Sequence, residues 1–164
     1  MVSIRKGSLL DLAEVQRLNQ ALFQHEREQR FYSGDSFNLK WPYEEAGAKY
    51  FKDCLSGTPA SVVFIAEANG QTAGYLAATC AAKSFLGYKR VAELDNMFVE
   101  ARFRSQGTGS KLVDTFKSWA LQNQASSIRV GAFALNHRAL KFYRRHGFAD
   151  REIYLEQLLS HDLK

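Results

Sequence analysis

The stretch 91–113 constrains the fold of this chain most, because it runs from a strand pattern through a glycine-containing loop into a helix pattern. It reads VAELDNMFVEARFRSQGTGSKLV. The acids Glu93 and Asp95 stand on either side of the apolar Leu94 in the stretch 91–99, as in a strand with two different faces. After the loop, apolar residues recur at helical spacing, namely Leu112, Val113, Phe116 and Ala120. We expect the rest of the chain to be organised around this unit.

Two carboxylates fall on one face of the expected strand. Glu93, Asp95 and Met97 alternate with Leu94, Asn96 and Phe98, and alternate residues of a strand share a face. Two acids on one face predict a polar cleft beside the strand.

The loop that follows, from Arg104 to Lys111, has the features of an anion site. It opens a helix, and the first backbone N–H groups of a helix have no partner within the helix. These donors and the positive end of the helix dipole favour a phosphate, and Arg102, Arg104 and Lys111 add positive charge around it. The loop lacks the third glycine of a dinucleotide fingerprint and the Gly-Lys-Ser/Thr of a mononucleotide P-loop.

The loop does match Arg/Gln-x-x-Gly-x-Gly/Ala directly after a strand ending in an apolar triplet. This arrangement resembles the cofactor-binding motif of the GNAT superfamily of N-acetyltransferases, which cradles the pyrophosphate of acetyl-coenzyme A (acetyl-CoA). The resemblance implies that acetyl-CoA is the cosubstrate. It also implies the following cofactor-binding residues in this part of the chain: Met97, Phe98, Val99, Arg104, Ser105, Gln106, Gly107, Thr108, Gly109 and Ser110.

A second motif lies near the C-terminus and reads NHRALKFYRRHGF from Asn136 to Phe148. It resembles the pattern Asn-x-x-Ala-x-x-Phe-Tyr-x-x-x-Gly-Phe at the last helix of the same family. Helical spacing alone places Asn136, Ala139 and Tyr143 on one face, and taken by itself it favours a core tyrosine with a satisfied hydroxyl. The resemblance implies that Tyr143 is the general acid for the sulfur of coenzyme A. It implies that Asn136 contacts the pantetheine arm or a water beside it.

The same resemblance suggests roles for the strand before the loop. Backbone groups of Met97 and Val99 would bind the thioester and the pantetheine arm, with an N–H near Met97 as the oxyanion donor. Glu93 falls where several family members carry a catalytic glutamate, so it is the candidate base, directly or through water, with Asp95 beside it. A carboxylate with a pKa of about 4 needs burial or a like-charged neighbour to deprotonate an ammonium with a pKa of about 10. Either acid could instead bind a cationic substrate.

The length predicts a single domain over residues 1–164, and the resemblance implies that it is an N-acetyltransferase domain. The fold class is α/β (α+β), with a mixed, mostly antiparallel sheet, helices on both faces and the order β-α-α-β-β-β-α-β-α-β(-β) of the GNAT fold. The expected elements are a strand at 3–5, a helix from Leu12 that fades over 24–28, a helix from Tyr43 to about Leu55, hairpin strands at 61–66 and 73–78 around Asn69-Gly70, the strand 91–99, a helix from Gly107 to about Gln122, a strand at 127–132, a helix at 136–146 and one or two strands over 148–159.

Two segments before the hairpin carry their own expectations. The charge-dense stretch 24–28 is predicted to be a solvated helix end. The aromatic-rich loop 31–41 either lines a binding cleft or caps the core, and the sequence does not choose between these.

Composition limits the other classes of function. The formal net charge is +5, but Lys and Arg are dispersed, which argues against a nucleic-acid binder. No apolar run approaches the roughly 20 residues of a membrane helix, and the N-terminus lacks a signal-peptide pattern, so we expect a cytoplasmic protein. Cys54 and Cys80 are remote from any His or Asp cluster, so no metal site is expected.

The expected function is therefore acetyl-CoA-dependent transfer to a primary amine, carried by a small molecule or a peptide. The alternative is a non-catalytic acyl-CoA-binding or sensing domain of the same fold. The family sets its acceptor mainly in the first two helices, here about Leu9 to Leu55, and this region matches no pattern that names an amine. Members of the family often form dimers, so a homodimer is a further expectation from the resemblance.

Overall fold

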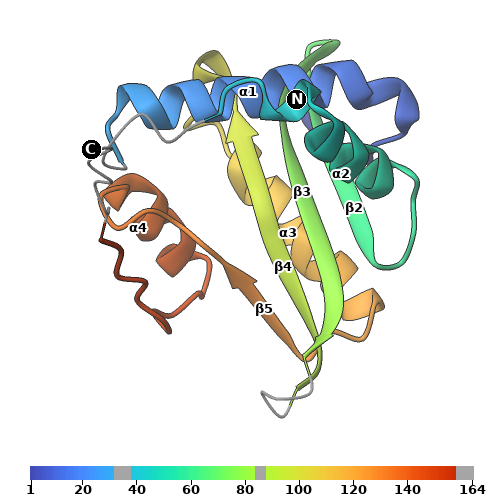
Figure 1. Ribbon diagram of the computed structural model, residues 1–164. Helices are drawn as coiled ribbons and strands as arrows, with labels where there is room; N and C mark the ends of the chain where they lie inside the picture. The colour runs from blue at the N-terminus through green and yellow to red at the C-terminus, as the bar shows by residue number, and fades with distance from the viewer. Residues whose placement is uncertain (32–37, 84–87, 158–164) are drawn as a thin grey trace, which may run out of the picture.

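The computed structural model describes residues 1–31, 38–83 and 88–157 (Figure 1). Five strands form one sheet in the order β1-β2-β3-β4-β5. They are β1 (Val2–Lys6), β2 (Ser61–Ala68), β3 (Gln71–Lys83), β4 (Tyr88–Val99) and β5 (Ser127–Val130). The first four pair antiparallel, and β5 pairs parallel with β4. The predicted mixed, mostly antiparallel sheet is confirmed.

Helices cover both faces of this sheet, as Figure 1 shows. The helices α1 (Leu12–Glu28) and α2 (Glu45–Leu55) lie on one face, α3 (Thr108–Gln122) lies on the other, and α4 (His137–Arg145) follows β5. Neighbouring residues of β3 serve the two faces in turn: Tyr75 packs with α1 and α2, whereas Leu76 packs with α3. Short 3₁₀ turns at Leu9–Asp11, Trp41–Tyr43 and Ala101–Phe103 precede α1, α2 and α3.

The hairpin between β2 and β3 forms at the predicted turn. Asn69 and Gly70 both adopt positive φ, 52° and 71°, and Ala68 pairs with Gln71 across them. Two successive left-handed residues match the twist of a two-residue hairpin, and Asn-Gly is the sequence that tolerates them best.

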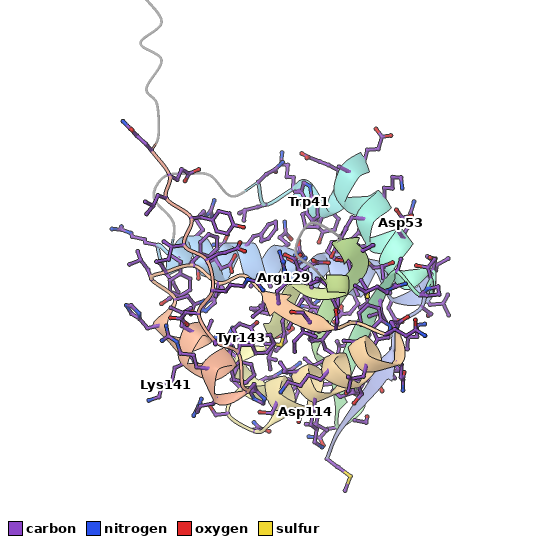
Figure 2. All side chains as sticks on the ribbon, turned by 90° about the horizontal axis from the view of Figure 1, so that it is seen from below. Trp41, Asp53, Asp114, Arg129, Lys141 and Tyr143 are labelled. Atoms are coloured by element: carbon purple, nitrogen blue, oxygen red, sulfur yellow. The ribbon has the colours of Figure 1, made fainter. Side chains whose placement is uncertain are left out.

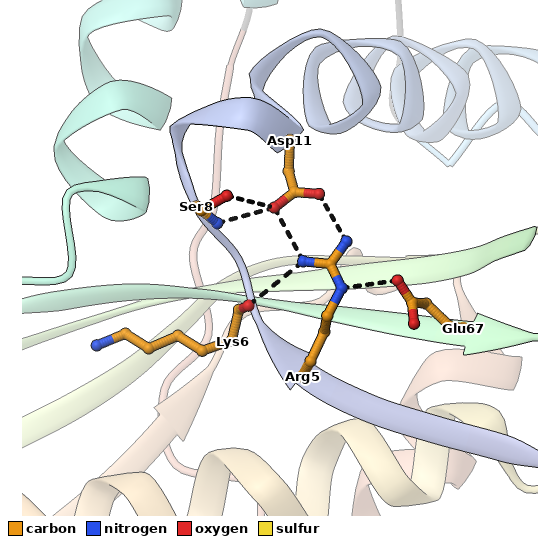
Figure 3. Close-up of polar contacts among 5 residues, drawn as sticks. All are labelled: Arg5, Lys6, Ser8, Asp11 and Glu67. Atoms are coloured by element: carbon orange, nitrogen blue, oxygen red, sulfur yellow. Dashed lines mark hydrogen bonds and ion pairs between the residues drawn. The ribbon is translucent and has the colours of Figure 1, made fainter. Parts of the chain in front are cut away.

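An ion-pair network fixes the start of α1 against the sheet (Figure 3). The guanidinium of Arg5 on β1 donates to both carboxylate oxygens of Asp11, at 2.9 and 2.7 Å, and to Glu67 on β2 at 2.6 Å. The backbone N–H of Ser8 also donates to Asp11, at 2.8 Å. These hydrogen bonds, chiefly the one from Arg5, lower the pKa of Asp11 to about 2.

The first helix ends at Glu28, within the stretch where the sequence predicts its end. Two expectations about the other elements need correction. The helix α2 begins at Glu45 because Trp41–Tyr43, with Pro42, forms a separate 3₁₀ turn. The strands expected over 148–159 are not formed within the described part of that stretch. There the apolar side chains of Ile153 and Leu155 are exposed, so they find no sheet surface to cover, and β5, at the edge of the sheet, has only four residues.

Most of the aromatic loop 31–41 lies outside the described residues. Within the described ranges, no helix is long and apolar enough to cross a membrane.

Candidate active site

The strand β4 continues beyond its pairing with β5. The parallel pairs run from Val91↔Ser127 to Leu94↔Val130, whereas β4 extends to Val99. Figure 1 shows the two strands diverging from this point, β4 toward α1 and β5 toward α4. Among the described residues, no strand therefore covers the edge of β4 from Asp95 to Val99.

A β-bulge marks the point of divergence. Ala77 of β3 pairs with Asn96 and Ala78 pairs with Leu94, so Asp95 is an extra residue without a partner in the sheet. One inserted residue reverses the alternation of everything after it. Met97 accordingly packs on the α3 side and Phe98 on the α1 and α2 side. The prediction that Met97 shares a face with the two acids is wrong for this reason.

The carboxylate of Asp95 is held by side chains from two other elements. The hydroxyl of Tyr50 on α2 donates to it at 2.9 Å, and the hydroxyl of Thr79 on β3 donates at 3.3 Å. Glu93 pairs with Thr79 in the sheet, so both acids lie on the α1 and α2 face. Sequence reasoning did not single out Tyr50, because no motif links α2 to β4.

Burial raises the pKa of Asp95 to about 6. The negative charge of Glu93 acts in the same direction, while the hydrogen bonds from Tyr50 and Thr79 oppose it. Asp95 as a whole residue is nevertheless exposed to solvent, so a substrate can reach it. A carboxylate with these properties is ionised at neutral pH and is a stronger base than an ordinary aspartate.

Tyr143 projects from α4 toward the core. Its ring packs edge-on against Phe148 at 5.7 Å and belongs to the cluster on the α3 side of the sheet. Figure 2 shows it on the inner side of α4, with Lys141 on the outer side. Burial, followed by the charge of Glu26, raises the pKa of Tyr143. The phenol is therefore protonated at neutral pH and can donate.

Asn136 begins α4 as its N-cap. Its side-chain oxygen accepts a hydrogen bond from the backbone N–H of Ala139 at 3.0 Å, as N-cap asparagines commonly do. Gly147 ends the helix at φ 85°, as the sequence predicts. The oxygen of Asn136 is thus engaged in the fold, and its NH₂ group is the part left for a ligand.

The backbone of the predicted phosphate loop has the required shape. Gly107 is the N-cap of α3 at φ 81°, and Ser105 also has positive φ. The N–H of Lys111 is the first to bond back to Gly107, at 3.0 Å, which leaves the three preceding N–H groups free for an anion. A Cβ atom at Gly107 would meet nothing within 4 Å. The open backbone and free donors fit a phosphate group.

The side chains of the loop mainly hold the loop itself. Arg104 donates to the carbonyl of Val99 at 2.8 Å and lies over the ring of Phe98, which ties the loop to the end of β4. Further contacts of this kind join Gln106 to the carbonyl of Arg102, Thr108 to the carbonyl of Phe103, Ser110 to His146, and Lys111 to the carbonyl of Val2. Lys111 is directed to β1, so the expectation that its charge surrounds the phosphate loop is not met.

Glu26 is an acid that sequence reasoning placed on a solvated helix end. It is instead half-buried, and desolvation raises its pKa to about 7. Burial, and after it the charge of Glu26, raises the pKa of Tyr75 on β3 and of Tyr143 on α4. Nothing in the mixed charges of 24–28 distinguishes this acid from its exposed neighbour Glu28.

The cysteines and metal-ligand types add no further site. Cys54 and Cys80 are buried free thiols. In the three described ranges, no group of three or more His, Cys, Asp or Glu side chains is arranged to hold a metal ion.

Comparison with known proteins identifies the family. The model of the acetyltransferase (GNAT) family matches residues 19–148, which is well over half of the chain. The protein therefore belongs to the GNAT acetyltransferases, a family that uses acetyl-CoA, as the two motifs predict. A curated relative, the uncharacterized N-acetyltransferase MJ1207 of Methanocaldococcus jannaschii, is 30% identical over 90 residues. That alignment covers 55% of this chain and 40% of the relative, so the chain spans less than half the length of that protein.

Solved structures share the fold across nearly the whole chain. A mutant of the protein BH1408 from Bacillus halodurans superimposes with a TM-score of 0.79 at 19% identity, covering 96% of this chain and 99% of that one. The aminoglycoside N-acetyltransferase AAC(6')-Iy in complex with CoA gives a TM-score of 0.74 at 19% identity, covering 96% and 95%. The predicted fold class is confirmed by these likenesses.

Proposed function

We propose that the protein is an N-acetyltransferase that moves the acetyl group of acetyl-CoA to a primary amine, within one domain. The observation that carries this proposal is the bulge at Asp95, where β4 separates from β5. The uncovered edge of β4 then lies between two groups of residues that the family motifs single out, the N-terminus of α3 and the inner face of α4. Both substrates would meet at this edge.

The phosphate loop supports binding of the cofactor. Free backbone N–H groups at the start of α3 and the open approach over Gly107 suit the pyrophosphate. We propose that the backbone of Met97, Phe98 and Val99 binds the rest of the cofactor, with the NH₂ group of Asn136 opposite. When bound, acetyl-CoA supplies an acetyl group activated as a thioester. A backbone N–H near Met97 would stabilise the negative charge on the acetyl oxygen.

Tyr143 is the proposed general acid. The nucleophilic amine displaces the thiolate, which then needs a proton, and a thiol has a pKa of about 8.5. The raised pKa of Tyr143 keeps the phenol protonated until that charge develops. Because the pKa of the phenol lies above that of the thiol, proton donation from Tyr143 to the thiolate is uphill in free energy.

One of the two acids of β4, Glu93 or Asp95, is the proposed base, acting directly or through water. An amine attacks only when neutral, so a carboxylate on the α1 and α2 face must accept its proton. The pKa of about 6 for Asp95 supports this role near neutral pH.

The proposed acceptor is a cationic primary amine. Glu93 and Asp95 place negative charge on the face that the first two helices cover. The half-buried Glu26 on α1, with a pKa of about 7, adds partial negative charge at neutral pH. The structural neighbour AAC(6')-Iy is an aminoglycoside acetyltransferase, and aminoglycosides and polyamines both carry several ammonium groups. Attraction of such amines would also raise their rate of encounter with the site.

The test is a thiol-release assay with acetyl-CoA and a panel of polyamines, aminoglycosides, amino acids and basic peptides. Thiol release that depends on one class of amine supports the proposal and names that class. If calorimetry detects acetyl-CoA binding and no amine on the panel is turned over, the chain acts instead as an acyl-CoA-binding or sensing domain.

A further inference from the structure

The contact between Tyr50 on α2 and Asp95 in the β4 bulge joins the acceptor side of the domain to the candidate base. A bulged residue has no partner across the sheet, so the sheet does not fix its side chain. Here the Tyr50 hydroxyl donates to one carboxylate oxygen at 2.9 Å, and the Thr79 hydroxyl donates to the other at 3.3 Å. The two donors hold both oxygens of Asp95.

Tyr50 is itself held in place by aromatic packing. Its ring lies 5.0 Å from Phe51 and 5.9 Å from Trp41, both in edge-on or tilted arrangements, which are the favoured geometries for aromatic pairs. Phe51 is fully buried and packs on Tyr75 of the sheet. The Tyr50 hydroxyl is therefore fixed relative to β3 and β4.

The geometry points to Asp95 as the group that accepts the proton of the amine, and to Tyr50 as the residue that positions the Asp95 carboxylate. This inference rests on the proposed acetyl transfer and chooses between the two acids that it leaves open. Glu93 pairs with Thr79 in regular sheet geometry, whereas Asp95 is the residue that the bulge pushes out of the sheet where β4 leaves β5.

The groups that face Asp95 make this inference testable by pH. They are Tyr50 and, behind it, Cys54 on α2, Thr79 on β3, and Glu93 on β4 itself. Burial raises the pKa of the Cys54 thiol to about 11 and raises that of Tyr50 further, so both are neutral while Asp95 titrates. Tyr50 and Thr79 lower the pKa of Asp95, and Glu93 raises it.

These contacts determine the direction in which each substitution should shift the pKa of Asp95. Tyr50→Phe removes a hydrogen bond to the charged form, so the acidic limb of the kcat/KM profile should move to higher pH by about 0.5 to 1 unit, the equivalent of one net hydrogen bond. Thr79→Val should move it the same way and less far, because that contact is longer. Glu93→Gln removes a like charge and should move the limb to lower pH. A purely structural role for Tyr50 predicts no shift of the limb.

The matched control is Tyr43→Phe, which removes a phenol hydroxyl from the turn before α2, where it contacts only Gln20 at 3.4 Å among the described residues. The acidic limb of the kcat/KM profile should stay at the wild-type pH in this variant. If the Tyr50→Phe enzyme turns over and the acidic limb of its kcat/KM profile lies at the wild-type pH, the inference is overturned while the proposed function stands. A wild-type protein that turns over no amine contradicts the proposed function itself.

A measurement without turnover separates these failures. NMR titration of the ¹³C-labelled carboxyl carbon of Asp95 should show its pKa raised in Tyr50→Phe and lowered in Glu93→Gln. Equal values in the wild type and in Tyr50→Phe would overturn the positioning role, whatever the assay shows.

Discussion

Gly109 at the start of α3 and Phe142 on α4 are in close contact. A Cβ atom built on Gly109 would lie 3.3 Å from Cζ of Phe142. The absence of a side chain at Gly109 therefore sets the distance between the phosphate loop and the helix that carries Tyr143. The glycine of the motif has a packing role between helices in addition to any contact with the cofactor.

This contact predicts that Gly109→Ala lowers turnover by about threefold to tenfold, because a small displacement of α4 moves Tyr143 away from the reacting sulfur. Steady-state kinetics would measure the effect. The double variant Gly109→Ala with Phe142→Leu gives the new methyl group room and should recover most of the loss. If the double variant is no better than Gly109→Ala alone, the contact does not set the position of α4.

Gly107→Ala should act on cofactor affinity instead. Gly107 has open space around it but adopts φ 81°, a conformation that costs other residues about 1 to 2 kcal/mol. The loop should relax and misplace its N–H donors, and calorimetry should show acetyl-CoA binding weakened by about tenfold. Affinity equal to that of the wild type would remove the N-terminus of α3 as the phosphate site.

Tyr143→Phe should lower kcat by about 10² to 10³, a typical loss for a general acid, with little change in acetyl-CoA affinity. The ring packing against Phe148 is kept in this variant, so the fold should not change. Stopped-flow thiol release and calorimetry together separate the two effects. Full turnover in Tyr143→Phe would exclude this tyrosine as the acid.

Glu26 should make stability depend on pH. Its folded pKa of about 7 exceeds the ordinary value of 4.5, so the unfolded chain loses this proton first as the pH rises. The free energy of unfolding should fall between about pH 4.5 and 7 and stay low above that, by about 1 to 3 kcal/mol. Glu26→Gln should abolish this fall in denaturant titrations at pH 5 and pH 8.

The control for Glu26 is Glu28→Gln, an exposed acid on the same turn of α1, which should keep the wild-type difference between the two pH values. An identical pH dependence in Glu26→Gln and in the wild type would show that Glu26 is solvated.

Asp11→Asn should destabilise the fold by about 1 kcal/mol, since it weakens a two-point contact with Arg5 at a partly exposed site. The lowered pKa means that this contribution is present above about pH 4 and is lost as the pH falls toward 2. Glu67→Gln weakens a single contact with Arg5 by removing its negative charge, and it should lower the thermal stability at pH 7 by less. Equal losses in the two variants would contradict the leading role of Asp11.

The sequence predicted most of the fold because its signals are local. Asn69-Gly70 specifies its own turn, and Gly147 specifies a helix end, since each conformation depends on one or two residues. The loop before α3 was predictable for the same reason. The two family motifs, at Arg104–Ser110 and Asn136–Phe148, then indicated the order of the elements.

The site was predictable only in part, because its decisive contacts join distant segments. The bulge at Asp95 depends on the pairing of β3 with β4, which the residues of 91–99 do not specify on their own. Tyr50 and Asp95 meet across 45 positions of sequence. The burial of Glu26 depends on what the last turn of α1 faces, which the charges around it do not reveal.

The most direct test of the account follows the acetyl group itself. The protein is incubated with [¹³C-acetyl]CoA and the amine that best stimulates thiol release, and the product is examined by NMR. The account predicts one labelled amide on a primary nitrogen, formed at a rate that Tyr143→Phe and Asp95→Asn both reduce. Label that stays on coenzyme A or appears only as free acetate, with every amine tested, would contradict it.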